Sequence, residues 1–166
     1  MTVDVAEKPQ ILAQTFKLRT QLLKKGRTHR IVASTKGPHG AMNIAMKCYA
    51  EGGENEFHAH GKEDHTFVIL QGRARFHQPD MPPIDLGKNE GILLPAGALY
   101  KFESTGREPL VIFRVGNVFQ PVSRANEDGT SADNSSRINR QGALMDARSA
   151  ENKHIDPVVI EGAWYE

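Results

Sequence analysis

The sequence has one cysteine, no long hydrophobic run and almost no surplus of charge. Cys48 is the only cysteine among 166 residues, which excludes an intrachain disulfide and a cysteine-cluster metal site. The 21 basic and 20 acidic side chains nearly cancel, so a nucleic-acid partner is not indicated. No stretch approaches the roughly 18 apolar residues of a membrane span, and MTVDVAEKPQ has no signal-peptide character. We expect a soluble cytoplasmic protein without membrane contact.

The first thirty residues carry a pattern that is typical of a helix. Leu12, Phe16 and Leu23 recur at helical spacing, with a proline before them and Gly26 after them. We therefore predict that residues 1–30 form an N-terminal helical arm.

The rest of the chain has the texture of a β protein. Residues 31–120 consist of short β-branched or aromatic runs cut by glycine, proline and acidic turns, which predicts an all-β sandwich or barrel. Residues 121–166 begin with a polar stretch that cannot bury enough surface to offset its ordering entropy. They end in HIDPVVIEGAWYE, for which we predict a strand that packs on a barrel, either its own or a partner's.

Three of the seven histidines fall in one window, FHAHGKEDHTFVILQG, at residues 57–72. Side chains alternate along a strand, so His58 and His60 project to one face, and a polar hairpin loop returns His65 beside them. Such a trio can place three imidazole nitrogens about 2.0 to 2.1 Å from one metal ion. The alternative, a polar turn that happens to be rich in histidine, would bury costly groups without compensation. We therefore favour a metal site.

The spacing of this window resembles the first sequence motif of the cupin superfamily. Gly52 is followed after five residues by His58 and His60, then by a ligand position at His65 and, six residues later, by Gly72. The resemblance implies a double-stranded β-helix (jelly-roll) barrel, one divalent metal inside it and frequently a homodimer.

The second motif of that family is matched more loosely. Asn89 stands where the first glycine is usual, while Pro95, Gly97 and the ligand-like position of Tyr100 follow the family spacing. The two motifs together span residues 52 to about 104.

The chain departs from the family at two ligand positions. The family set is two histidines, a glutamate and a histidine, but His65 occupies the glutamate position and Tyr100 that of the last histidine. The resemblance implies His58, His60, His65 and Tyr100 as metal ligands. Asp64 is a rival of His65, although Gly72 sets the spacing that selects position 65 and strand neighbours do not both point inward.

Tyr100 has three possible roles that the sequence does not separate. It is a fourth ligand, a catalytic acid/base or hydrogen-bonding group, or a buried aromatic that fills space. Three neutral imidazoles would leave the full double charge on the metal and favour an anionic co-ligand. Arg73 and Arg75 are candidates for holding a substrate carboxylate, but a solvated outer face is the preferred interpretation.

These features predict a metal-dependent enzyme that acts on a small organic molecule. We favour a mononuclear non-haem iron dioxygenase with one Fe²⁺ per chain, and Zn²⁺, Ni²⁺, Mn²⁺ or Cu²⁺ are alternatives. The competing functions are a metal-dependent lyase, isomerase or cyclase, and a non-catalytic barrel that binds a small ligand. We expect a homodimer, because the terminal segments offer apolar surface that a single small barrel would leave exposed.

Overall fold

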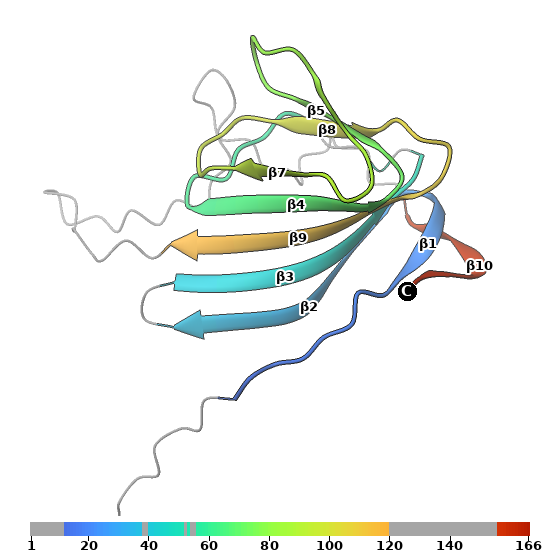
Figure 1. The fold of residues 1–166 in the computed structure, drawn as a ribbon, viewed down its shortest axis with the longest axis horizontal. Helices are drawn as coiled ribbons and strands as arrows, with labels where there is room; N and C mark the ends of the chain where they lie inside the picture. The colour runs from blue at the N-terminus through green and yellow to red at the C-terminus, as the bar shows by residue number, and fades with distance from the viewer. Residues whose placement is uncertain (1–11, 38–39, 52, 54–55, 120–155) are drawn as a thin grey trace, which may run out of the picture.

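The computed structural model describes residues 12–37, 40–51, 53, 56–119 and 156–166 (Figure 1). These residues form ten strands, and they contain no helix that is long and apolar enough to cross a membrane. The strands are β1 Thr20–Lys25, β2 Arg27–Gly37, β3 Gly40–Tyr49, β4 Glu63–Gln71, β5 Ala74–His77, β6 Ile84–Leu86, β7 Gly91–Leu94, β8 Lys101–Ser104, β9 Leu110–Phe119 and β10 Val158–Tyr165.

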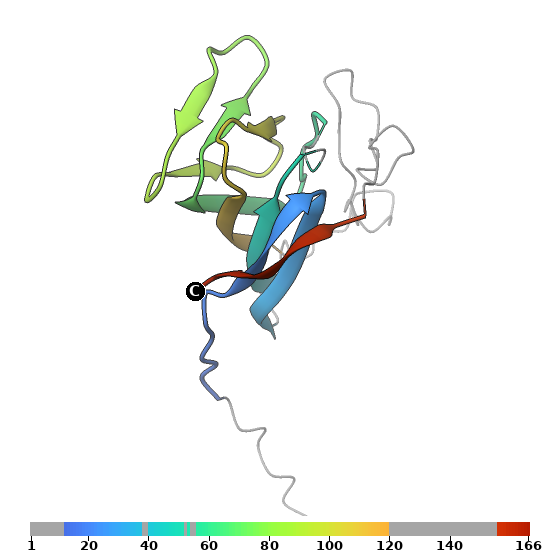
Figure 2. The same cartoon turned by 90° about the vertical axis from the view of Figure 1, so that its right-hand side faces the viewer.

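The strands form a large sheet, a small sheet and a two-stranded ribbon. The large sheet has the order β2-β3-β9-β4-β7, the small sheet has the order β6-β5-β8, and β1 pairs with β10. All of these pairings are antiparallel. Figures 1 and 2 show the small sheet as a separate layer beside the large one. The all-β, jelly-roll prediction is confirmed.

The main hydrophobic core lies between the two sheets. Alternation along β4 buries His65, Phe67 and Ile69 on one face. Phe67 meets Phe76 of β5 and Phe102 of β8 with ring centroids 5.8 and 5.9 Å apart. These aromatic side chains therefore pack the two sheets against each other and fill the interior of the barrel beside the histidines.

Backbone conformation explains why the two sequence motifs have glycine or asparagine at fixed places. Gly72 has φ +78°, and a Cβ there would lie 3.1 Å from the Cα of Leu110. Asn89 and Gly97 also have positive φ, +67° and +84°. Asparagine tolerates this left-handed region better than most residues, so Asn89 can occupy a position where the family has glycine. Gly52 lies outside the described residues.

The predicted N-terminal helix is wrong for the described residues. Residues 12–19 carry no regular structure, and Thr20–Lys25 form the strand β1. The register of β1 with β10 shifts twice, so Thr20 and Leu23 are both buried although they are three residues apart. Of the three residues whose spacing suggested a helix, Leu23 is thus buried by an irregular strand, and Leu12 and Phe16 lie in the segment without regular structure.

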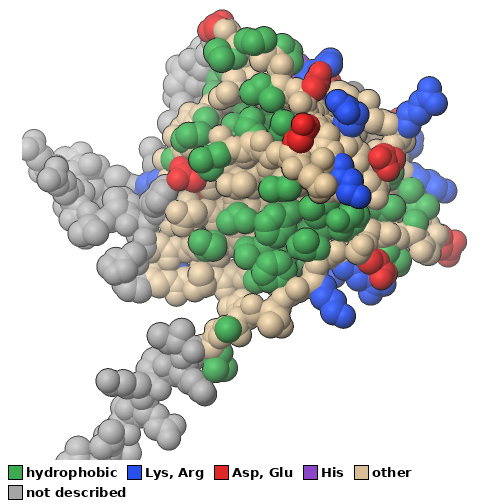
Figure 3. Space-filling model, in the orientation of Figure 1, with side chains coloured by type: hydrophobic (Ala, Val, Ile, Leu, Met, Phe, Trp, Pro, Cys, Tyr) green, Lys and Arg blue, Asp and Glu red, His purple; other side chains and the backbone are tan. Residues whose placement is uncertain are grey.

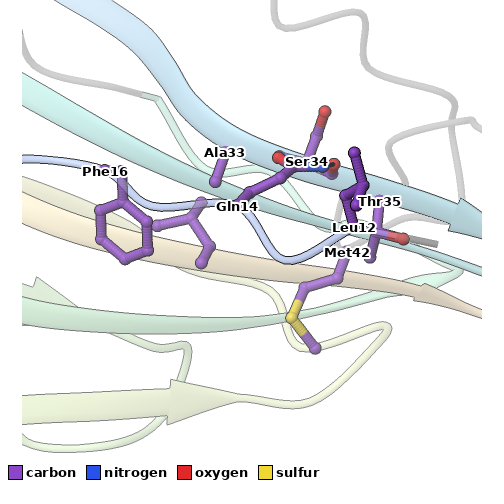
Figure 4. Close-up of a pocket in the computed structure, with 8 residues that line it drawn as sticks. Leu12, Gln14, Phe16, Ala33, Ser34, Thr35 and Met42 are labelled. Carbon is purple, nitrogen blue, oxygen red and sulfur yellow. Dashed lines mark hydrogen bonds between the residues drawn. The ribbon is translucent and has the colours of Figure 1, made fainter. Parts of the chain in front are cut away.

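The segment before β1 is instead held along the edge of the large sheet (Figure 4). The Gln14 side chain donates a hydrogen bond of 2.7 Å to the carbonyl of Ser34 and accepts one of 3.2 Å from its N–H. Phe16 stacks on Phe113 with ring centroids 6.3 Å apart. These contacts favour an extended chain over a helix at this position.

A second, smaller core covers the outer face of the large sheet. Leu23 of the ribbon packs there with Met46, Cys48 and Val111, and Tyr165 of β10 lies against them. Burial raises the pKa of the Cys48 thiol to about 11, so this cysteine stays protonated. Figure 3 shows hydrophobic side chains gathered over this face, with charged side chains around them. The predicted C-terminal strand thus packs on its own chain.

Candidate metal centre

The first histidine and Tyr100 are fixed to each other by the backbone. His58 and Tyr100 form an isolated antiparallel bridge, and each N–H donates to the other's carbonyl at 3.0 Å. Their rings lie with centroids 4.5 Å apart, and both side chains are buried. The bridge therefore brings the two sequence motifs together inside the barrel.

Three side chains have their donor atoms close together: one lies just before β4 and two lie at its start. The ring nitrogens of His60 and His65 and a carboxylate oxygen of Glu63 lie within 4.8 Å of one another. Glu63 Oε2 is 3.0 Å from His65 Nε2 and 3.7 Å from His60 Nδ1. Glu63 was missed in the sequence, although it precedes His65 by two residues and so shares its face of the strand.

Two of the three donor pairs are close enough to share a divalent metal ion, and the third, between His60 and His65, lies within 4.8 Å. Ligand atoms lie about 2.0 to 2.2 Å from such an ion, so two of them stand at most about 4.4 Å apart. The two distances from Glu63 satisfy that limit. Gly116 faces His65 across the sheet, and a Cβ there would collide with the Glu63 carboxylate and the Arg114 guanidinium. Because glycine has no side chain, position 116 leaves space for these charged groups.

Arg114 of β9 is the second residue that the sequence did not reveal. Its side chain is buried, and Nη2 donates to Glu63 Oε1 and also contacts Nε2 of His65. Nη1 donates to Oδ1 of Asn43. Its Nε is buried and has no hydrogen-bond partner among the described residues. The guanidinium therefore contacts the same nitrogen of His65 that a metal would use, and the same carboxylate of Glu63, although through Oε1, while Oε2 faces the histidines.

The charges of this group are set by its neighbours. Burial raises the pKa of Glu63, but the hydrogen bond from His65 and the charge of Arg114 outweigh it and lower that pKa to about 2. Burial lowers the pKa of His65, and the charges of Arg114 and Lys47 lower it further against the opposing effect of Glu63. At neutral pH the site therefore holds an ionised carboxylate beside a neutral imidazole.

Hydrogen bonds orient two of the histidine rings. His65 Nδ1 lies 3.2 Å from the hydroxyl of Tyr100, and His58 Nδ1 lies 2.8 Å from the carbonyl of Glu56. In the metal-free site, Nε2 of His65 carries the proton that it donates to Glu63. A bound metal would require the other tautomer, in which each Nδ1 donates its proton to its neighbouring oxygen and each Nε2 presents its lone pair. The hydroxyl of Tyr100 thus faces the opposite nitrogen of His65 from the one beside Glu63.

The structure also shows where the other site residues suggested by the sequence lie. Asp64 points away from the cluster, where Oδ1 accepts a hydrogen bond of 2.7 Å from the N–H of Ala96. His65, by contrast, is buried inside the barrel. Arg75 forms a bidentate pair with Asp85 on an exposed part of the small sheet, which agrees with a solvated outer face. His58 does not join the group of three, so its role as a ligand stays a prediction, as does that of Tyr100.

The fold and the site define a double-stranded β-helix barrel that carries a histidine and glutamate cluster inside it. Residues 45–116 match the family model described as "Cupin domain". This part of the chain therefore forms a cupin domain.

Solved structures are similar to this chain, and the one with a TM-score of 0.50 supports the same fold. The cupin domain of Cnp3 from Schizosaccharomyces pombe has a TM-score of 0.50 and 16% identity, over 58% of this chain and 67% of that one. A cupin superfamily protein from Desulfitobacterium hafniense gives 0.48 and 18%, over 58% and 81%. KdgF from Halomonas sp. gives 0.48 and 17%, over 57% and 82%. No curated protein matches the sequence.

Proposed function

We propose that the protein is a metal-dependent enzyme for a small organic molecule, with Fe²⁺ as the favoured metal and dioxygenase-type oxidation as the favoured reaction. The group of His60, Glu63 and His65 carries this proposal, because two histidines and one carboxylate are a donor set typical of non-haem iron oxygenases. A ferrous ion in such a site supplies activation of dioxygen beside open coordination positions. The cupin domain at residues 45–116 supports a metal at this place in the barrel.

The surrounding side chains have separate tasks in this proposal. Tyr100 holds Nδ1 of His65 and so positions that ligand. Phe67 lies under the His65 ring, with centroids 5.6 Å apart, and excludes water from the inner side of the site. His58 and Tyr100 also remain candidates for ligands, and Tyr100 for a catalytic hydrogen-bonding group.

Metal analysis of the purified protein is the first test. We expect about one equivalent of iron per chain, its loss in the variant that replaces His58, His60 and His65 by alanine, and a clear reduction in Glu63→Gln. Asp64→Asn is the matched control, because its carboxylate binds the backbone of Ala96 and should leave the metal content unchanged. A protein that holds no metal after reconstitution with iron, zinc, manganese or nickel would contradict the proposal.

A metal-dependent lyase, isomerase or cyclase is the second candidate. The Arg114 guanidinium beside Glu63 and His65 supports it, because a fixed cation stabilises the negative charge of an enolate without oxygen. Oxygen uptake with diketones, phenols or thiols distinguishes the dioxygenase, and anaerobic turnover with Zn²⁺, Ni²⁺, Mn²⁺ or Cu²⁺ distinguishes this candidate. Tight ligand binding without product would indicate a non-catalytic barrel.

A homodimer and a cytoplasmic location complete the proposal. Exposed apolar side chains, among them Phe16, Met42 and Trp164, support self-association. Sedimentation equilibrium of the full chain tests the dimer, and a monomer at all concentrations would contradict it. Removal of residues 123–166 tests the contribution of the C-terminal strand.

A further inference from the structure

Two basic side chains, Arg114 and Lys47, lie near Glu63 inside the described part of the barrel. Glu63 is the acidic member of the cluster, while Arg114 contacts it and Lys47 lies on the same inner face of the sheet. The ammonium of Lys47 lies 5.7 Å from the ring centroid of Phe67, and that ring is in turn 5.6 Å from the ring of His65. A divalent metal would add two further positive charges to this buried place. Uncompensated buried charge is costly, so the loaded site favours an anion.

Arg114 is built to take such an anion but uses only part of its donor set. Nε and Nη2 lie on one edge of the guanidinium, and together they match the two oxygens of a carboxylate. Arg75 uses this edge on Asp85, with Nε and Nη2 donating at 2.7 and 2.9 Å. In Arg114, Nη2 donates to Glu63 while the buried Nε has no partner.

A metal would compete with Arg114 for the same two side chains. The guanidinium contacts an oxygen of Glu63 and Nε2 of His65, and both residues belong to the candidate donor set. Nη2 donates to Oε1 of Glu63, while Oε2 faces the two histidines. If the metal binds both oxygens of that carboxylate as well as Nε2 of His65, Nη2 loses its partners, whereas Nη1 can still donate to Asn43. The Nε and Nη2 edge would then be released as a pair.

We propose that Arg114, assisted by the charge of Lys47, is the anion-binding residue of this barrel. Its ligand is a small organic molecule with a carboxylate, and metal binding at His60, Glu63 and His65 exposes the guanidinium edge to it. Arg114 therefore neutralises Glu63 before the metal arrives and binds substrate after it. This inference rests on the proposed metal site, and it specifies the substrate class of that site.

Such an exchange makes metal and anion affinities reciprocal. If the metal strengthens carboxylate binding by a factor, the carboxylate must strengthen metal binding by the same factor, and couplings of this kind are typically about 5- to 150-fold. Arg114→Met removes both the competitor of the metal and the partner of the anion. We expect this variant to bind metal at least as tightly as the wild type and to lose the linkage.

The test uses butyrate as the probe and the uncharged butyramide as its control. Binding to the folded full-length protein is followed by ligand-observed NMR, with and without one equivalent of Zn²⁺, and Zn²⁺ affinity is measured by chelator competition with and without butyrate. We expect zinc to tighten butyrate binding about tenfold or more, with no such effect on butyramide. Arg114→Met should abolish the effect, and Arg114→Lys, which keeps the charge without the planar edge, should weaken it. Arg75→Met is the matched control and should behave as the wild type.

The outcomes separate the two proposals. Zinc binding without any tightening of butyrate, or an unchanged linkage in Arg114→Met, overturns the role of Arg114 and leaves the metal site intact. A wild type that binds no zinc, iron, manganese or nickel overturns the metal-dependent function together with this inference.

Discussion

The hydroxyl of Tyr100 offers the sharpest test of how the site is organised. It lies 3.2 Å from Nδ1 of His65, and both side chains are 3% exposed. Tyr100→Phe keeps the ring and removes only this hydroxyl, so Nδ1 of His65 is left buried without that partner. A buried polar group that loses its partner costs about 1 to 3 kcal/mol. We expect the free energy of unfolding of the metal-free protein to fall by about 1 to 2 kcal/mol.

The same substitution should weaken metal binding without removing it. Groups that orient a metal-binding histidine typically contribute about 10- to 100-fold in metal affinity, and we expect a loss in that range for Tyr100→Phe. Guanidinium unfolding followed by circular dichroism measures the stability, and competition with a chromophoric chelator measures the affinity. Tyr165→Phe, on β10, is the matched control.

Three results would contradict this reasoning in different ways. Unchanged stability and unchanged metal affinity would mean that the ring of Tyr100 only fills space. Complete loss of metal would make Tyr100 a ligand. Normal metal affinity with lost turnover would make it a catalytic residue.

Further predictions concern the core, the surface and pH. Phe102→Ala, at a side chain that is 1% exposed, should lower the free energy of unfolding by about 3 to 5 kcal/mol in denaturant titrations, and a loss below 1 kcal/mol would argue against a shared aromatic core. Arg75→Ala should change it by less than about 1 kcal/mol, because the pair with Asp85 is exposed. The pKa of His65 is lowered by folding, so the metal-free protein should lose stability as the pH falls below about 6.5, where the unfolded chain binds the proton first. The pKa of Glu63 is lowered from 4.5 to about 2, which adds a second loss over that interval, and Glu63→Gln should remove this part of a pH-dependent unfolding curve.

The sequence was sufficient for the barrel and for the position of the site inside it. Period-two alternation and regularly spaced turns are local signals, and they predicted the strand that carries His65. His58 and His60 were expected on a strand as well, but His58 forms only an isolated bridge and His60 lies in no strand. The same alternation places Glu63 on the face of His65, but the motif spacing, which selects position 65 alone, does not single out this carboxylate.

Other features depend on contacts between distant parts of the chain. Arg114 enters the site because β9 pairs with β4 in a register that places Gly116 opposite His65, and no local pattern determines that register. The N-terminal prediction failed for a similar reason, since the irregular pairing of β1 with β10 sets which of its residues are buried.

The pairing of β1 with β10 can be followed by tryptophan fluorescence, separately from the folding of the barrel. About 130 residues of chain separate these two strands, so β1 has no partner until the segment containing β10 has been synthesised. Trp164 is the only tryptophan, and it lies on β10 with the guanidinium of Arg19 4.1 Å from its ring centroid. Its fluorescence therefore reports the closing of the ribbon, whereas circular dichroism reports the barrel, and a gap between the two transitions would reveal a barrel that folds before its ends are joined.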